Sequence, residues 1–215
     1  MKIAVLGTGD VGRTLATKFV SLGHGARLGS RSADHEGARV WAAERGVAAG
    51  HGTFDDVAGW ADLVVNATSG QHSVAVVRSI APAHLEGKVL IDVSNPLDFS
   101  KGFPPTLSVL HDDSLAEQIQ RAAPAARVVK SLNTMANPIM VDPAQLGEDT
   151  DVFVCGDDEA ARAEVTALLA SMGWRSIRDL GPLSQARGLE AWLLLWTRLF
   201  GSLGHANFNL RLVGA

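Results

Sequence analysis

The sequence predicts an α/β fold in which a doubly wound, mostly parallel β-sheet is followed by a small helical C-terminal part. Short apolar runs rich in β-forming residues alternate with helical patterns along most of the chain, and this alternation is typical of a parallel sheet with helices on both faces. The first apolar run, residues 2–6, leads directly into a glycine-rich turn and then into a helical pattern. This strand–turn–helix order is typical of a Rossmann-type domain.

The turn after the first strand has the glycine spacing that holds a dinucleotide pyrophosphate. Gly7 permits the sharp turn, Gly9 leaves room for the pyrophosphate, and Gly12 lets the helix lie close to the sheet. Free N–H groups at the start of the helix attract the anion. Asp10 brings a carboxylate to the same place, which repels the pyrophosphate unless the side chain points away or bonds the helix N-terminus, so the role of Asp10 stays open. The predicted cofactor contacts in the turn are Gly7, Thr8, Gly9, Asp10, Val11 and Gly12.

The residues that follow the second predicted strand, 26–29, favour NADP(H) over NAD(H). An NAD site ends this strand with an acidic residue that binds the ribose 2′-hydroxyl, whereas a 2′-phosphate needs donors and positive charge. Here Ser30 and Arg31 follow the strand, and Thr8 offers another hydroxyl. The alternative is that Asp34 serves an NAD site, but Asp34 lies beyond the basic turn in a polar stretch that resembles a helix start.

The remaining chain continues the alternation of strands and helices. The expected elements are a helix through residues 39–43, a linker rich in glycine and alanine over 46–52, a strand over 62–67, a helix over 74–80, a strand over 89–93, a helix over 114–123, a strand over 127–132, a strand over 152–155, a helix over 157–172 and a further strand over 174–179.

Three polar loops follow strands of the predicted sheet, at residues 68–72, 94–97 and 133–137. Ligands of parallel sheets bind outside the carboxyl ends of the strands, so we expect these loops to surround the nicotinamide. Ser, Asn and Pro also occur in ordinary turns, so the evidence is the three loops together rather than any single residue. The predicted cofactor contacts are Thr68, Ser69, His72, Ser94, Asn95, Leu97 and Asn137, and the predicted ring-positioning residues are Asn133, Thr134 and Met135.

A long apolar helix is predicted to follow Pro182. Its apolar residues recur at helical spacing and cover more than one stripe, so a single sheet does not cover them all. We expect a homodimer interface on this helix, with Trp192 and Trp196 as anchors. A core helix in a monomer is the alternative. The expected organisation is a Rossmann-type dinucleotide-binding domain over 1–180 and a dimerising helical extension over 181–215.

Composition limits the function classes. The net charge of -4 argues against nucleic acid or a membrane surface as the partner and leaves small molecules. The single cysteine, Cys155, excludes an internal disulfide and lies in an apolar run typical of a buried strand. No membrane-spanning stretch or leader is expected, which predicts a cytoplasmic protein. The seven histidines lack metal-ligand spacing, and the absence of tyrosine removes the Tyr and Lys pair of short-chain dehydrogenases.

Several motifs together resemble the coenzyme F420-dependent NADP oxidoreductase family, over essentially the whole chain. These motifs are residues 7–12, Gly29-Ser30-Arg31, residues 154–158, and residues 181–184 followed by Arg187 and Glu190. The resemblance implies a Rossmann-type domain with a small helical part, a homodimer, and reversible hydride transfer between NADPH and a deazaflavin. It also implies that Thr8 to Val11, Ser30, Arg31, Thr68, His72, Asn95 and Leu97 contact NADP, and that residues 133–137 lie where the two rings meet.

The resemblance fixes the acceptor less closely than the cofactor. Archaeal members of the family carry a histidine at the position of Asn133 and hydroxyl side chains at the positions of Ala191 and Leu193. Residues 128–133 also resemble the oxidoreductase domains of metalloreductases, which pass hydride to a flavin. Transfer between stacked rings needs no protein acid or base, only carbons held about 3–3.5 Å apart.

The sequence therefore predicts an NADP-dependent oxidoreductase that acts on coenzyme F420 or a flavin. Two alternatives stay open: an NADPH-dependent reductase of a small carbonyl or imine, in which Lys130 and Asn133 would handle the proton, and an NADP(H)-binding sensor without turnover. We favour a structural role for Lys130, or a contact with phosphate, because it lies within a predicted strand.

Overall fold

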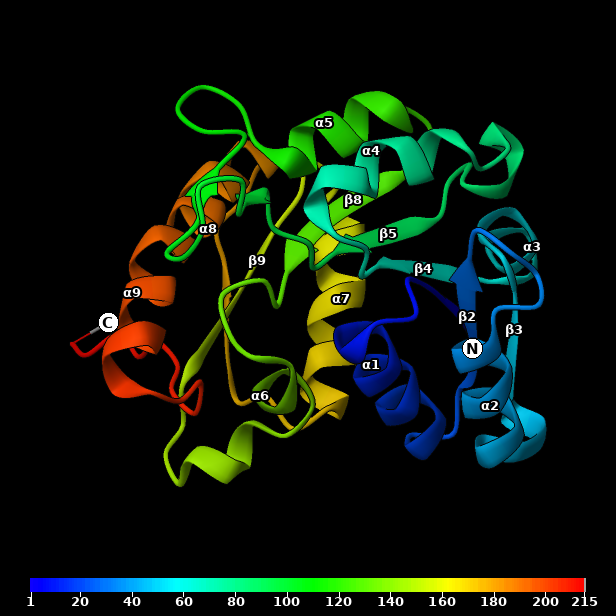
Figure 1. Cartoon of the computed structure of the whole chain (residues 1–215), viewed down its shortest axis with the longest axis horizontal. Helices are drawn as coiled ribbons and strands as arrows, with labels where there is room; N and C mark the ends of the chain where they lie inside the picture. The colour runs from blue at the N-terminus through cyan, green and yellow to red at the C-terminus, as the bar shows by residue number, and fades with distance from the viewer. Residues whose placement is uncertain (215) are drawn as a thin grey trace.

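The computed structural model describes residues 1–214 and has an eight-stranded sheet at its centre, with helices on both faces (Figure 1). The strands of this sheet are β1 (Lys2–Leu6), β2 (Gly25–Ser30), β3 (Ala49–Thr53), β4 (Leu63–Asn66), β5 (Val89–Asp92), β8 (Arg127–Ser131), β9 (Asp151–Cys155) and β10 (Ser176–Asp179). They lie in the order β10-β9-β8-β5-β4-β1-β2-β3. The predicted doubly wound α/β fold is confirmed.

Helices connect most of the strands. They are α1 (Asp10–Ser21), α2 (Glu36–Arg45), α3 (Phe54–Trp60), α4 (Gly70–Arg78), α5 (Leu115–Ala122), α6 (Asn137–Val141), α7 (Glu159–Ser171), α8 (Ala186–Ala191) and α9 (Leu193–Leu203). Shorter 3-10 turns are Gly46–Ala48, Pro82–His84, Pro143–Leu146 and Leu183–Gln185, and β6 (Leu97–Asp98) and β7 (Thr106–Leu107) form a small antiparallel hairpin.

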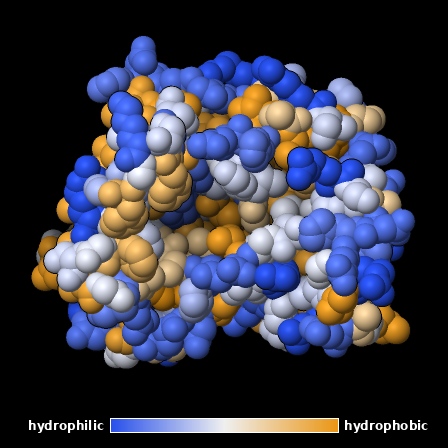
Figure 2. Space-filling view, viewed as in Figure 1, coloured by the Kyte–Doolittle hydropathy of each residue, from blue (hydrophilic) through white to orange (hydrophobic). Residues whose placement is uncertain are grey.

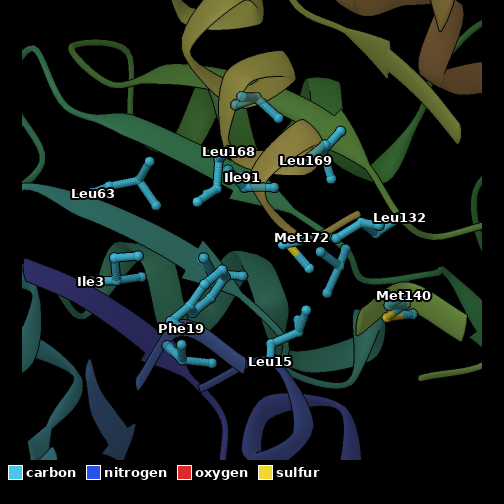
Figure 3. Packing of buried hydrophobic residues seen from close by; sticks show 14 of the residues in the cluster. Ile3, Leu15, Phe19, Leu63, Ile91, Leu132, Met140, Leu168, Leu169 and Met172 are labelled. Carbon is cyan, nitrogen blue, oxygen red and sulfur yellow. The ribbon is translucent and has the colours of Figure 1, made fainter. Parts of the chain in front are cut away.

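The strand β1 lies inside the sheet, parallel to β2 and β4, and is buried on both faces. Ile3 and Val5 pack into the cluster that contains Phe19 of α1, whereas Ala4 and Leu6 pack into the cluster on the opposite face. Figure 3 shows Ile3 and Phe19 within the first cluster. Burial on both faces explains why this strand is a continuous apolar run rather than an alternating one.

One strand pairing departs from the parallel pattern. The strand β9 is antiparallel to β8, with Ser131 opposite Val154, and β10 is parallel to β9. This agrees with a sheet predicted to be mostly parallel. Because β9 runs the other way, its first residue, Asp151, lies toward the edge where the parallel strands end.

The predicted linker over residues 46–52 is wrong. A 3-10 turn there leads into β3, which pairs with β2 alone at the edge of the sheet, and α3 follows. The sequence of β3, Ala-Gly-His-Gly-Thr, has weak strand preference. Its two glycines are used in packing: a β-carbon at Gly50 would lie 3.1 Å from the Arg27 side chain, and one at Gly52 would lie 3.2 Å from Asp56.

The long helix predicted after Pro182 is divided by a turn at Trp192 into α8 and α9. Both tryptophans that were predicted as interface anchors contact their own chain. The Trp192 indole donates to the Thr134 carbonyl (3.1 Å), and the Trp196 ring stacks on Phe200 and Phe208. The apolar residues of α9 that stay most exposed are Leu195 and Leu203, each 50% exposed.

The last described residues return to the sheet and bind the start of β9. The Asp151 amide donates to the Leu210 carbonyl (2.8 Å), and the Asn209 amide donates to the Asp151 carbonyl (3.0 Å). The Asp151 carboxylate, 2% exposed, accepts from Arg178 Nε (2.7 Å), the Ser176 hydroxyl and the Leu212 amide. Burial alone would raise the pKa of this carboxyl, but the three donors outweigh burial and lower the pKa.

Acid is therefore expected to weaken this attachment. Because the pKa of Asp151 is lower in the folded protein, its stabilisation is present above the unfolded pKa and is lost as pH falls through the folded pKa. Asp151→Asn is expected to lower the free energy of unfolding by about 1–3 kcal/mol at neutral pH and by less below about pH 4. Urea unfolding between acidic and neutral pH measures this. Asp149→Asn, at an exposed carboxylate 3.7 Å from Arg175, is the control; equal losses for the two variants contradict the prediction.

Across residues 1–214, every helix is too short or too polar to cross a lipid bilayer. Within the same range, His, Cys, Asp and Glu side chains nowhere gather in a group of three or more that could hold a metal ion.

Candidate functional site

The glycine turn between β1 and α1 is held by close backbone contacts. Gly7 has a φ of +115°, and a β-carbon there would lie 2.6 Å from the Ala67 carbonyl oxygen. A β-carbon at Gly12 would lie 2.3 Å from the Gly7 carbonyl oxygen, whereas the space at Gly9 is open. No side chain caps the N-terminus of α1 among the described residues. The first N–H groups of α1 are thus available to an anion, as pyrophosphate binding requires.

The turn gives separate tests of folding and of cofactor binding. Gly12→Ala is expected to lower the free energy of unfolding by about 1–3 kcal/mol, because its methyl group would meet backbone. Gly9→Ala is expected to leave stability unchanged, since Gly9 has a φ of -74° and open space around it. It should weaken NADPH binding by about tenfold or more, because the methyl group fills the space for the pyrophosphate. Urea unfolding and NADPH fluorescence titration measure the two effects; unchanged NADPH affinity in Gly9→Ala contradicts the prediction.

Asp10 points away from the turn. Its side chain is 85% exposed, and its carboxylate accepts from the Arg13 guanidinium at 2.8 Å, one helical turn further along α1. The negative charge of Asp10 is therefore paired at the surface, and its role as a cofactor contact stays a prediction.

A first cavity of about 670 Å³ lies between the glycine turn, the end of β2 and the start of α4. The predicted residues that line it are Gly7, Thr8, Gly9, Ser30, Arg31, Thr68, Ser69 and His72. Ser30 is buried, and its hydroxyl accepts from the Ser32 amide (3.1 Å), which fixes the turn that carries the exposed Arg31. Asp34, the acidic alternative, lies outside this lining.

Sequence reasoning missed several residues of the first cavity. The β3–α3 junction contributes Thr53, Phe54 and Asp55, which lie just after the predicted linker and were assigned to no element. His35 lines a recess beside Arg31, and its Nε2 lies 3.3 Å from the Thr8 hydroxyl. The cap pattern of α3, Thr53 followed by Asp56, could have revealed this helix start and with it the second wall of the cavity.

A second cavity, of about 560 Å³, opens where β4, β5 and β8 end (Figure 2 shows a hollow near the middle of this face). The predicted residues that line it are Val11, Thr68, Ser69, Ser94, Asn95, Leu97, Asn133, Met135 and Asn137. Its other wall is supplied by Phe99, Leu193, Trp196 and Ala206, so the C-terminal part completes it. None of the described residues that line this cavity is charged.

Two asparagines join two of the predicted loops in this cavity. Asn133 Nδ2 donates to Asn95 Oδ1 (2.9 Å), and Asn95 Nδ2 donates to the Asn133 carbonyl (2.9 Å). Asn133 Nδ2 also donates to the Leu189 carbonyl of α8 (3.0 Å). Leu132, with a φ of +61°, makes the turn that presents Asn133. The cavity floor is therefore fixed to both the sheet and the C-terminal helices.

The structure does not bring every predicted site residue to a cavity. Three predicted residues, Asp10, Gly12 and Thr134, line neither cavity. Asp10 is exposed, and Gly12 packs against the backbone of Gly7. Thr134 is buried, and its carbonyl accepts from the Trp192 indole. Thr68 and Ser69 line both cavities, and Ala67 beside them does the same. The two cavities thus meet at the end of β4.

Lys130 belongs to a buried polar network beneath the second cavity. Its ammonium group bonds Asp92 Oδ2 (2.7 Å) and Glu190 Oε1 (2.9 Å), and Lys130 is 0% exposed. Burial alone would lower the pKa of Lys130, but the two carboxylates outweigh burial and raise it. Lys130 therefore stays charged, and its buried contacts agree with the structural role that we favoured. The network reaches the cavities through Asn66, which bonds both Asp92 (2.9 Å) and Thr68 (2.7 Å).

Comparisons with known proteins point to one family. The model of the family described as coenzyme F420-dependent NADP oxidoreductase matches residues 2–96. An F420-dependent NADP reductase from Methanothermobacter thermautotrophicus is 31% identical over 88% of this chain and 85% of its own length. The chain belongs to the F420-dependent NADP oxidoreductase family. The resemblance found in the sequence is thereby confirmed.

Two further proteins are similar to this chain. The crystal structure of an Arthrobacter sp. FB24 protein, named as a candidate F420-dependent NADP reductase, shares 48% identity with a TM-score of 0.94 and covers 99% of both chains. Metalloreductase STEAP3 from Rattus norvegicus is 30% identical over 88% of this chain. The chain spans only 36% of the length of that metalloreductase.

As a member of this family, the protein is an NADP-dependent oxidoreductase that transfers a hydride. Cys155, in β9, is fully buried, and burial raises the pKa of its thiol to about 12, so its position is typical of a structural cysteine and not of a nucleophile. This agrees with the buried strand position predicted for it. The residues matched by the family model, 2–96, include the whole lining of the first cavity and only part of the lining of the second.

Proposed function

We propose that the protein transfers a hydride between NADP(H), bound along the glycine turn, and coenzyme F420, seated in the second cavity. The observation that carries this proposal is the junction of the two cavities at Thr68 and Ser69. A dinucleotide whose adenosine half fills the first cavity would extend past this junction and present its nicotinamide ring in the second. The ring of a deazaflavin would then stack against it.

The residues present in the first cavity fit NADP(H). Arg31 stands where a 2′-phosphate needs charge and donors, and Ser30, whose hydroxyl donates to the Ser32 carbonyl, holds the turn that presents it. The uncapped N-terminus of α1 and the open space at Gly9 suit the pyrophosphate. We propose all of the predicted residues that line this cavity as cofactor contacts, and we add His35 beside Arg31.

The residues present in the second cavity fit a flat, uncharged ring. Leu97, Met135 and Trp196 supply apolar surface, while Asn95 and Asn133 supply amide groups at the floor. NADP(H) bound here supplies the hydride, and the chain's own residues hold the rings and exclude water. The mutual hydrogen bonds of the two asparagines keep the floor rigid.

A reductase of small carbonyls or imines needs a group that moves a proton to the substrate. Lys130, the residue considered for that role, is held between Asp92 and Glu190 and lies outside the lining of the second cavity. None of the described residues that line this cavity is a charged acid or base. This favours hydride transfer between rings.

One assay separates the candidates. NADPH oxidation is followed at about 340 nm with F420, with FMN and FAD, and with a panel of ketones and imines. Turnover with F420 is expected. Turnover with flavins alone would move the assignment to a flavin reductase, and turnover with ketones or imines alone would contradict the proposal. Tight NADPH binding without oxidation by any acceptor would support a sensor instead.

We also propose that the protein forms a homodimer through α9. The exposed apolar side chains of this helix are Leu195, Phe200 and Leu203, and the exposed Phe103 ring meets Phe200 edge-on with centroids 6.1 Å apart. An exposed patch of this kind is typical of a protein interface. Leu195→Glu/Leu203→Glu is expected to give a monomer in sedimentation velocity at low micromolar concentration. A wild-type protein that sediments only as a 22.6 kDa species contradicts the proposal.

A further inference from the structure

Asp55 is the one acidic side chain among the described residues that line the first cavity. It lies in the first turn of α3, directly after β3, and contacts Ala81 and His84, which follow the end of α4. Figure 1 shows α3 beside β2 and β3 at the edge of the sheet. An acidic residue in a cavity that fits an anionic cofactor needs an explanation, because a carboxylate repels phosphate.

One oxygen of Asp55 is engaged and the other is available. Oδ1 accepts from the Ala81 amide (2.8 Å) and from His84 Nδ1 (2.8 Å), whereas Oδ2 bonds no residue between 1 and 214. The Ala81 N–H lowers the pKa of the Asp55 carboxyl, and the contact with His84 adds to this against a smaller opposing effect of burial. Asp55 is therefore ionised at neutral pH, and its free oxygen can only accept a hydrogen bond.

The turn that carries Asp55 is rigid. Thr53 and Asp56 form a capping box at the start of α3: the Thr53 hydroxyl accepts from the Asp56 amide (3.1 Å), and the Asp56 carboxylate accepts from the Thr53 amide (3.1 Å). With the contacts to Ala81 and His84, this fixes the carboxylate before any ligand arrives. A fixed acceptor discriminates between ligands more sharply than a mobile one.

The surroundings of Asp55 fit a purine. Phe54, Ala75 and Val76 line the same cavity and give apolar surface to the faces of a flat ring. The phosphates of NADP(H) are attracted to Arg31 and to the N-terminus of α1, which leaves the uncharged base for the part of the cavity beside Asp55. The exocyclic amino group is the hydrogen-bond donor on the edge of adenine.

We propose that Asp55 selects the adenine base of the cofactor by accepting a hydrogen bond from its exocyclic amino group. This inference rests on the proposed binding of NADP(H) in the first cavity. A base with a carbonyl oxygen in place of the amine would place that oxygen against the Asp55 carboxylate. Both groups are acceptors, so this base binds more weakly. The rejection is moderate, because the Asp55 side chain is 43% exposed.

The test compares NADPH with its hypoxanthine analogue, in which the adenine amine is replaced by a carbonyl group. Dissociation constants are measured by fluorescence titration on the full chain, without an acceptor, so the result is independent of turnover. Wild-type protein is expected to prefer NADPH by about tenfold. In Asp55→Asn the amide keeps an oxygen for the Ala81 N–H and offers an N–H₂ group to the base, so the preference is expected to fall to about one.

Asp34→Asn is the matched control, because Asp34 is exposed and lies outside both cavities; it should keep the wild-type preference. Thermal unfolding of each variant shows that the fold is intact. Tight and equal binding of both nucleotides by wild type overturns the role of Asp55 alone. An unchanged preference for NADPH over the hypoxanthine analogue in folded Asp55→Asn overturns it as well. Failure of wild type to bind NADPH contradicts the proposed function, and this inference with it.

Discussion

Lys130→Met is expected to lower the free energy of unfolding by about 3–5 kcal/mol, since removing one partner of a buried ion pair leaves the others uncompensated. Here the remaining groups are the carboxylates of Asp92 and Glu190, exposed by 0% and 2%. Glu190 has some compensation, because its oxygens also accept from the Leu115 and Ala116 amides at the start of α5 (2.8 and 3.1 Å). Asp92 retains Asn66 and Ser94 as donors.

Urea or guanidinium unfolding measures this loss, and Lys101→Met, at an exposed lysine, is the control that should stay within about 0.5 kcal/mol of wild type. The triple variant Asp92→Asn/Lys130→Met/Glu190→Gln removes all three charges, so it is expected to recover part of the stability. A loss below about 1 kcal/mol in Lys130→Met would show that the network contributes little.

Arg31→Ala is expected to raise the KM for NADPH by about 10–100-fold, because hydrogen bonds to charged groups contribute about 1.5–3 kcal/mol. Arg31 lines the first cavity beside Ser30, and no carboxylate ends β2 to compete for it. NADH lacks the 2′-phosphate, so its KM should change little.

Steady-state kinetics with both nucleotides measure the ratio. Arg45→Ala, at the exposed end of α2, is the control and should leave both values unchanged. Equal losses for NADPH and NADH in Arg31→Ala would contradict the assignment of Arg31 to the 2′-phosphate. The same measurement tests the alternative in which Asp34 binds the ribose 2′-hydroxyl of NAD(H). A wild-type preference for NADH would support that alternative.

Features that depend on neighbouring residues were predictable from the sequence. The glycine turn combines strand, tight turn and helix start within residues 2–12, so local sterics define its shape. The polar loops at Thr68, Asn95 and Asn133 could be assigned to one edge because the carboxyl ends of parallel strands meet there. The position of Cys155 inside a buried strand followed from its apolar neighbours.

Features that depend on distant residues were not predictable in the same way. The strand β3 forms because the edge of β2 is available to it, although its own residues favour strand weakly. Missing β3 and α3 meant missing Asp55. The pairing of Lys130 with Glu190 joins residues far apart in the chain, and no spacing rule connects a strand lysine with a glutamate on a later helix.

The two cavities are lined by different segments of the chain, and this separation has an evolutionary consequence. Residues 7–79 line the whole of the first cavity, whereas the second takes its far wall from residues 93–140 and 193–206. Among the described residues, only Ala67, Thr68 and Ser69, just after β4, line both cavities. In the proposed arrangement the first cavity holds only the adenosine half of the cofactor, so a lineage can keep that half bound unchanged while mutations in the later segments alter the acceptor. Such a chain is well suited to acquire new redox partners.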